Sequence, residues 1–463
     1  MQNPNRVASR PAVAVATIAL ACLWPGYNLR AEIPDSYRTR WRDPAVVQRI
    51  ERNIEAHRKG DATITVVDAN NRPVAGAEVA LQQTTHAFLF GCNAFVLGQL
   101  EPAEVEQRYE EAFAHLFNFA TVPFYWAGTE PTRGELRYAE PAQDIWRRPP
   151  PDRFLSWAAR YGIALKGHPL LWHAHNPPWL PQDPDALRQL YQKRFEEIAA
   201  RYADRIGIWD VVNESLVCPQ SYPLFTPDRS YVQWAFQQVA PLFPDQTTLM
   251  INEVANFNFP PASERYFTQI QQLMAAGTPI RGIGFQYHYF RREALDSHLA
   301  NPSCDPNTLL DVYEQFASFQ VPLYITEITI PSAGDGGEQL QAEVVRDHYR
   351  LWFSAPTMAG ITWWNLGDGT AMQGENEAQG GLLDADLKPK PAYTALDQLI
   401  NQEWMTRLAT RTDEHGALHF RGFYGKYTVQ VTAEGETEEY TIELARGGPA
   451  THQLVWKTPP SER

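Results

Sequence analysis

Two glutamates in this sequence are placed where a pair of carboxylates could do chemistry. Glu214 follows the apolar segment Ile206–Val212 by two residues, and Glu327 lies near the end of the apolar segment Leu323–Ile328. Cleavage of a glycosidic bond needs one carboxylic acid that protonates the leaving oxygen and a second carboxylate beside the developing oxocarbenium ion. A gap of about 5–5.5 Å between the two gives retention of configuration, and a wider gap gives inversion. The pair suits this chemistry if the fold holds both residues across one cleft.

Further polar and aromatic residues stand at the ends of other apolar segments. They are His168, Trp172, His173, His175, Asn213, Asn252, Glu253, Gln286, Tyr287, His288, Trp363 and Trp364. Charged side chains are rarely buried without a partner, so a plain hydrophobic core does not explain this pattern. We interpret these residues as parts of one site.

The elements that would position the site are short apolar segments alternating with longer segments of helical period. The apolar segments are Ala87–Cys92, Phe119–Trp126, Ile163–Gly167, Ile206–Val212, Thr248–Ile251, Ile280–Gln286, Leu323–Ile328 and Ile361–Trp364. Eight such alternations predict a (β/α)8 TIM barrel, whose active sites lie at the carboxyl ends of the strands. An open doubly wound sheet is the alternative, but no glycine-rich phosphate loop follows any of these segments.

The segments on either side of the barrel have strand-like period. Residues 38–58 predict a charged amphipathic helix; after it come strand candidates at 62–68, 79–81, 417–420, 426–432, 440–443 and 453–456. Neither flank is long enough for a core of its own, so we predict one small accessory β-sandwich built from both. The predicted boundaries are 1–31 for a signal peptide, 32–90 for the N-terminal helix and strands, 91–402 for the catalytic barrel and 403–463 for the C-terminal β-domain.

The N-terminus has the pattern of an export signal. Arg6 and Arg10 precede an apolar run, Ala12–Trp24, that is too short to span a bilayer, and cleavage could follow Ala31. Cys22 weakly resembles a lipoprotein site, and we favour simple secretion. We therefore expect a secreted or periplasmic protein without a membrane span. Cys22 aside, three cysteines remain, which allows at most one disulfide.

Charge and composition narrow the classes of partner. The net charge of −14 argues against binding of nucleic acid or of anionic membranes through charge. The 14 tryptophans supply flat apolar faces on which sugar rings can stack. We expect a polysaccharide substrate and a monomeric protein.

Six motifs in order resemble glycoside hydrolase family 10, the family of retaining endo-β-1,4-xylanases. The motifs are residues 167–173, Trp209–Glu214, residues 282–288, Ile325–Ile328, residues 360–364, and Leu383-Asp384 with residues 388–393. They span roughly residues 88–400 and agree with the barrel that the apolar pattern predicts by itself. The resemblance implies a secreted endo-β-glycanase that hydrolyses β-1,4-xylan or a related polysaccharide.

The resemblance also assigns roles by position. Glu214 would be the general acid/base and Glu327 the nucleophile of a double displacement that needs no metal and no organic cofactor. For this, Glu214 should have a raised pKa while Glu327 stays ionised. The other matched residues would bind the sugar or support the pair: Asn213 at the 2-hydroxyl, His288 and Gln286 beside Glu327, His168 and Trp172 on the glycone side, and Trp364 as an apolar floor.

Two segments depart from the family pattern. The end of the second strand usually carries Glu, Asn and Lys groups that grip the neighbouring xylose, but residues 122–126 read Val-Pro-Phe-Tyr-Trp, with Tyr125 where Lys is expected. The loop 369–374 lacks the second Trp that usually follows strand eight. Loss of hydrogen-bonding groups can change discrimination by several powers of ten, so we expect an altered sugar specificity with Tyr125 as part of the binding site.

Other interpretations stay open at this point. A glycan-binding protein could keep the barrel without turnover, although such a protein would have little reason to keep the full set around the two glutamates. A metal-dependent hydrolase could use His173 and His175, but Asp is scarce at the other strand ends. We expect Glu253 to support the site from outside it. Asp210 should be structural, because its side chain points away from the face of Glu214.

Overall fold

The barrel is the central unit of the structure. The computed structural model describes residues 33–254 and 258–457. Within them, parallel strands close in the order β5-β4-β3-β11-β10-β9-β8-β7, with β5 pairing β7 and the short β6 (Leu171–Trp172) extending β7. The strands are β3 (Leu89–Asn93), β4 (Phe119–Pro123), β5 (Ala164–His168), β7 (Ile208–Asn213), β8 (Thr248–Glu253), β9 (Gly282–His288), β10 (Leu323–Thr329) and β11 (Met358–Trp363). The predicted (β/α)8 barrel is confirmed.

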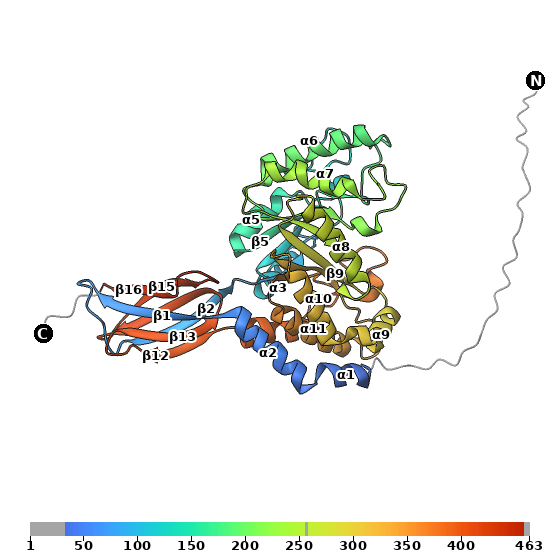
Figure 1. Cartoon of the computed structure of the whole chain (residues 1–463). Helices are drawn as coiled ribbons and strands as arrows, with labels where there is room; N and C mark the ends of the chain where they lie inside the picture. Colours follow the sequence, from blue (N-terminus) through green and yellow to red (C-terminus); the bar gives the residue numbers. More distant parts are fainter. Residues whose placement is uncertain (1–32, 255–257, 458–463) are drawn as a thin grey trace, which may run out of the picture.

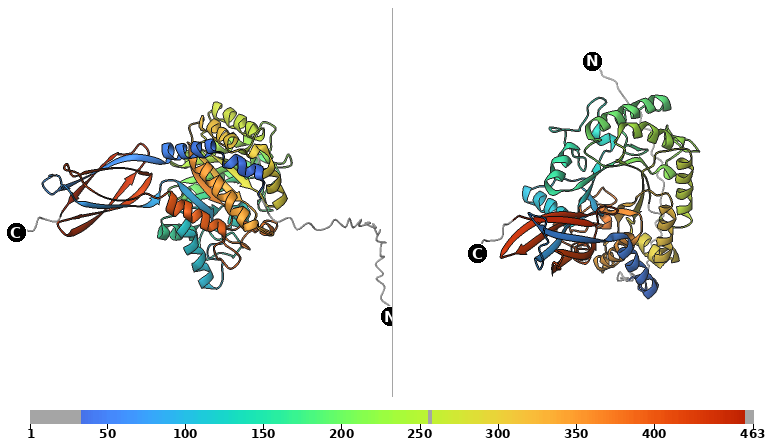
Figure 2. Two further views of the ribbon diagram at one scale, coloured as in Figure 1. Left: turned by 90° about the horizontal axis from the view of Figure 1, so that it is seen from below. Right: turned by 60° about the vertical axis from the view of Figure 1, so that its left-hand side comes forward.

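Helices surround the strands, as the right-hand view of Figure 2 shows. They are α3 (Ala103–Leu116), α4 (Trp126–Thr129), α5 (Asp152–Tyr161), α6 (Pro184–Tyr202), α7 (Ser230–Val239), α8 (Ala262–Ala275), α9 (Arg292–Ala300), α10 (Pro306–Ala317), α11 (Gly337–Ser354) and α12 (Pro391–Asp397). Local sequence fixes several helix starts. At α6, for example, the Asp183 carboxylate accepts a hydrogen bond from the Ala186 amide at 2.8 Å, and Pro184 occupies the first turn.

Three elements differ from the sequence-based prediction. The helix expected over 38–58 is two helices, α1 (Asp35–Trp41) and α2 (Pro44–Arg58), because Pro44 disfavours a helical conformation at Asp43. The second barrel strand, expected to reach residue 126, ends at Pro123. Strand β12 (Arg407–Arg411) escaped prediction because most of its side chains are exposed, so it lacks an apolar alternation.

The two flanks of the chain form one β-sandwich, as expected (Figure 1). One sheet has the order β13-β1-β16 and the other β12-β2-β14-β15, so each sheet joins one N-terminal strand to C-terminal strands. The remaining bounds are β1 (Lys59–Asp68), β2 (Glu78–His86), β13 (Ala417–Phe423), β14 (Gly425–Ala433), β15 (Glu436–Leu444) and β16 (Thr451–Trp456). Apolar residues of both flanks share its core, among them Ile64, Leu81, Val429 and Trp456.

The sandwich is attached at the amino-terminal end of the barrel strands. A cavity of about 570 Å³ at this junction is lined by Phe88, Pro322 and Met358 from the barrel side and by Tyr424 and Arg446 from the sandwich. The barrel residues of this set stand at or just before strand starts. The sandwich therefore leaves the opposite, carboxyl-terminal mouth of the barrel open.

The N-terminal segment and the cysteines were the subject of separate predictions. The predicted signal peptide, 1–31, lies outside the described residues. No helix in the described part of the chain is long and apolar enough to cross a membrane. Cys92, Cys218 and Cys304 are buried free thiols, which is consistent with the prediction of at most one disulfide. The exact domain boundaries stay a prediction.

Candidate active site

A cavity of about 440 Å³ opens at the carboxyl ends of the barrel strands. All of the side chains predicted to act on or bind a substrate line it: Tyr125, His168, Trp172, Asn213, Glu214, Gln286, His288, Glu327 and Trp364. The fold thus brings together residues that are spread over some 240 positions of the sequence.

Glu327, on β10, is buried and held by two donors. The Asn252 amide donates to its Oε1 at 2.9 Å, and His288 Nε2 lies 3.1 Å from its Oε2. Burial lowers the pKa of His288 to about 4, so the ring is neutral near pH 7. With Nδ1 2.9 Å from the Thr329 hydroxyl, a neutral His288 accepts from Thr329 and donates from Nε2 to Glu327. These contacts fix the direction in which the carboxylate points.

Glu214 follows β7 in a left-handed backbone conformation, with φ of 57°. Non-glycine residues pay a conformational cost there, and such strain often occurs at functional sites. The Trp172 indole donates to Oε2 at 3.0 Å and the Gln286 amide donates to Oε1 at 3.0 Å. Both carboxylate oxygens therefore stand at the cavity, oriented by neutral donors.

Asn252 connects Glu327 to Asn213, the residue before Glu214; the sequence placed it among the strand-end residues of the site but assigned it no role. Its amide nitrogen donates both to Glu327 and to Asn213 Oδ1, the latter at 2.8 Å, and its Oδ1 accepts from Thr326 at 2.6 Å. A Cβ at Gly284 would lie only 2.4 Å from this oxygen, so the glycine makes room for the amide. Its position at the end of the fifth barrel strand was the feature of the sequence that indicated a place in the site.

A buried charged group lies beneath His168. Asp210 Oδ2 accepts from Lys166 Nζ at 2.8 Å and lies 2.6 Å from His168 Nδ1. Burial alone would raise the pKa of Asp210, but Lys166 and His168 hold it below its usual range. His168 Nε2 in turn lies 4.0 Å from Glu327. Asp210 thus orients His168 from outside the cavity, and Glu253 similarly binds Ser215 and the Leu216 amide next to Glu214.

Burial raises the pKa of both cavity glutamates. For Glu327 the effect of burial outweighs the nearby His168 and Lys166, which lower its pKa, and the pKa rises to about 7. Burial also raises the pKa of Glu214, and the negative charge of Glu327 adds to this. The expectation that only Glu214 would be shifted was too simple, because it neglected the desolvation of Glu327.

The raised pKa of Glu327 predicts a pH-dependent gain in stability for the Glu327→Gln variant. Between pH 4.5 and 7 the folded protein binds more protons at Glu327 than the unfolded chain, so rising pH costs stability. A shift from 4.5 to about 7 corresponds to about 3 kcal/mol at most. Denaturant unfolding should show the variant gaining stability over wild type at pH 8 and little at pH 4.5. An equal gain at both pH values would contradict the shift.

Aromatic rings line the rest of the cavity. Trp364 meets His168 and His288 edge-on, with centroid distances of 5.8 and 5.7 Å. Tyr125 packs beside Trp172 at 5.6 Å and His175 at 4.9 Å. Trp364 therefore packs against the two histidines that lie next to Glu327, and Tyr125 lies at the end of the cavity formed by Trp172 and His175.

Six residues that line the cavity were not predicted from the sequence: Arg147, Arg148, Val254, Phe290, Met372 and Glu375. The two arginines lie in the connection 130–151, and Met372 and Glu375 lie in the connection after β11. Irregular connections have no periodic pattern of apolar residues, so the sequence does not indicate which way their side chains point. The arginines are nevertheless fixed in place, since Arg147 donates to Asn365 Oδ1 at 2.6 Å and to the Thr370 carbonyl.

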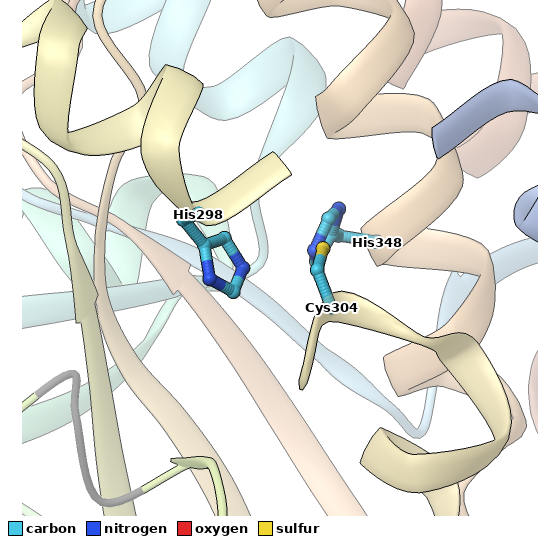
Figure 3. Close-up of side chains that lie close together, drawn as sticks. All are labelled: His298, Cys304 and His348. Carbon is cyan, nitrogen blue, oxygen red and sulfur yellow. The ribbon is translucent and has the colours of Figure 1, made fainter. Parts of the chain in front are cut away.

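Figure 3 shows a different group of possible metal ligands, His298, Cys304 and His348. Their ligand atoms lie within 4.8 Å of one another, and all three residues are buried. The Tyr287 hydroxyl already lies 3.2 and 2.8 Å from Nε2 of the two histidines, and Trp41 of α1 packs on His348 at 4.5 Å. These contacts give the group a structural part in seating α1. His173 and His175 belong to no such group among the described residues, and the absence of a metal from the reaction stays a prediction.

Comparisons with known proteins place the chain in a family. The model of glycosyl hydrolase family 10 matches residues 105–399. The chain is 25% identical over 422 residues to the anti-sigma-I factor RsgI6 of Acetivibrio thermocellus, covering 89% of this chain and 50% of that protein. It is 26% identical to endo-1,4-beta-xylanase B of Thermotoga neapolitana, covering 65% of this chain and 86% of that one. It spans only 31% of endo-1,4-beta-xylanase 2 of Arabidopsis thaliana.

Solved structures show the same fold. Native xylanase 10B from Thermotoga maritima superposes with a TM-score of 0.57 at 24% identity, covering 68% of this chain and 96% of that one. The family match covers more than half of the chain and includes both cavity glutamates. The family resemblance drawn from the motifs is thus confirmed, and the chain belongs to glycosyl hydrolase family 10.

Proposed function

We propose that the protein is a secreted, retaining endo-β-glycanase that hydrolyses β-1,4-xylan or a related polysaccharide. The observation that carries the proposal is the pair Glu214 and Glu327, which line one cavity and are each oriented by separate neutral donors. Family membership supports glycoside hydrolysis, and several relatives of this chain are endo-1,4-beta-xylanases.

The first step of the proposed reaction forms a glycosyl-enzyme ester. A Glu327 oxygen attacks the anomeric carbon while the bond to the leaving oxygen breaks, and Glu214 gives its proton to that oxygen. The Trp172 and Gln286 donors fix the orientation of the Glu214 carboxyl group that gives this proton. Asn213 would bond the 2-hydroxyl, a contact that strengthens in the transition state.

The second step releases the sugar. Glu214, now a carboxylate, takes a proton from water, whose oxygen attacks the anomeric carbon and displaces Glu327. The donors on Glu327, Asn252 and His288, stabilise the carboxylate that leaves. Two inversions at the same carbon give net retention.

The proposal also covers the cellular location and the oligomeric state of the protein. The basic and apolar N-terminal pattern supports export to the periplasm or the medium, where a polymeric substrate is found. We propose a monomer, because the mouth of the barrel already contains both carboxyl groups and needs nothing from a second copy.

A second candidate is a β-glycosidase of altered sugar specificity, or a glycan-binding protein without turnover. The observation that favours it is the cavity wall at Tyr125, where an aromatic ring replaces the polar groups expected there. Both candidates keep a glycan as the ligand and differ from the first in which sugar is bound and whether it is cleaved.

Product analysis distinguishes these functions. Wild type would be incubated with glucuronoxylan, arabinoxylan and mixed-linkage β-glucan, and the released oligosaccharides separated. Xylo-oligosaccharides of several lengths support the proposal. Cleavage of the glucan alone would show redirected specificity, and no cleavage of any of the three would favour the glycan-binding protein.

A further inference from the structure

The end of the cavity at Tyr125 carries a guanidinium with two unused donors. Arg148 lines the cavity and is only 9% exposed. Its Nη1 donates to the Arg147 carbonyl at 2.7 Å. Its Nε and Nη2 have no hydrogen-bond partner in the part of the chain that the structure describes, yet neither is sealed from solvent as Arg147 Nε is. Nε and Nη2 form the edge of arginine that pairs with a carboxylate through two parallel hydrogen bonds.

The position of this guanidinium is built into the fold. It lies 3.9 Å from the centroid of the Tyr125 ring. Its aliphatic stem packs on Gly128, where an added Cβ would lie 3.0 Å from Arg148 Cδ. Arg137 donates to the Gly128 carbonyl and, at 3.2 Å, to the Arg148 carbonyl, so one buried side chain holds both partners. A guanidinium placed in this way loses little conformational entropy when it binds a ligand.

The charge of Arg148 has no ion-pair partner within 4.0 Å among the described residues. The charged side chains that act on it are Arg147, which is a like charge, and Glu375, which accepts a hydrogen bond from Asn365 at 3.2 Å. Burial lowers the pKa of Arg148 to about 10, so it remains charged at neutral pH. A cation that is nearly buried without a counter-charge is costly, and in a substrate cavity it favours an anionic ligand.

We propose that Arg148 binds the carboxylate of an acidic sugar carried by the β-glycan, such as a uronic acid substituent, at the Tyr125 end of the cavity. The inference rests on the proposed function and names its substrate class. Neutral hydroxyls would leave the positive charge uncompensated, whereas a carboxylate matches the free Nε–Nη2 edge. The net charge of the whole protein, −14, repels an acidic polysaccharide. Attraction for an acidic sugar would therefore come from the local positive charge of Arg148.

The test compares two polymers that differ only at the carboxyl group. Wild type should show a kcat/KM on glucuronoxylan at least about tenfold above that on the same polymer after reduction of its carboxyl groups to alcohols. Arg148→Gln should bring this ratio to about one, and Arg148→Lys should fall between them because lysine lacks the planar fork. Arg133→Gln is the matched control, since Arg133 stacks on Trp179 from the same connection without lining the cavity.

A wild-type ratio of one, or an unchanged ratio in Arg148→Gln, would overturn the proposal. Binding separates this result from failure of the proposed function. If wild type cleaves neither polymer, calorimetry with glucuronic-acid-bearing xylo-oligosaccharides and their reduced forms still measures the preference. At least tenfold tighter binding of the acidic form by wild type, lost in Arg148→Gln, supports the carboxylate site, and equal binding of both forms refutes it. Thermal unfolding of each variant shows whether it is folded.

Discussion

Replacing Glu327 by glutamine should lower kcat on every glycan substrate by about four orders of magnitude or more. Glutamine has the same size and can still accept the hydrogen bond from Asn252. Its amide cannot attack the anomeric carbon, so no glycosyl-enzyme ester can form. Because both steps of the double displacement pass through that ester, a better leaving group cannot rescue the variant. Initial rates on a polysaccharide and on an aryl glycoside measure the loss.

Glu253→Gln serves as the control for this experiment. Glu253 is also a buried glutamate at a strand end, and burial raises its pKa to about 7, but it binds Ser215 and Leu216 outside the cavity. Its replacement should cost far less than that of Glu327. Substantial turnover by Glu327→Gln, or an equal loss in both variants, would remove Glu327 from the nucleophile role.

Replacing Glu214 by alanine should separate substrates by their leaving groups. On a natural polysaccharide the first step needs a proton, and loss of the general acid costs about 10²–10⁴ in rate. A dinitrophenyl glycoside leaves without protonation, so its first step should be nearly unaffected. The aryl glycoside should therefore release a burst of phenol equal to the enzyme present, followed by slow turnover, because the general base for the second step is also missing. Stopped-flow absorbance records both phases.

The two active-site variants check each other. Added azide should raise the turnover of Glu214→Ala on the aryl glycoside, because this anion can attack the glycosyl-enzyme without a general base, and it should do nothing for Glu327→Gln. If Glu214→Ala lost both substrates equally and azide had no effect, the acid/base assignment would be wrong. Burial and the nearby Glu327 raise the pKa of Glu214, which favours the protonated form that the first step needs.

The sequence predicted most of the barrel because its strands are buried on both faces. Segments such as Leu323–Thr329 are buried along their whole length and begin with an apolar run, so the polar residues near their ends stand out against that background. The same logic located Glu214, Glu327 and the other predicted lining residues, since parallel strands bring their carboxyl ends together. Pairing of the two flanks into one sandwich followed from the fact that neither could bury a core alone.

What escaped prediction depends on contacts between segments distant in the sequence. Arg148 faces the cavity only because its connection folds back over Gly128 and Tyr125. The role of Asn252 depends on space left by Gly284 on the next strand. The pKa of Glu327 is set by how deeply the finished barrel buries it. None of these features has a periodic signature in the sequence, and each requires the three-dimensional arrangement.

We propose that Glu214 and Glu327 hydrolyse a β-glycan by double displacement with retention. The measurement that tests it most directly is proton NMR of a glucuronoxylan digest during its first minutes, before the new reducing ends mutarotate. Wild type should release reducing ends in the β configuration, with the α signal growing later, and Glu327→Gln should release none. Reducing ends that appear first as the α anomer, or equal release by the variant, would contradict the proposal.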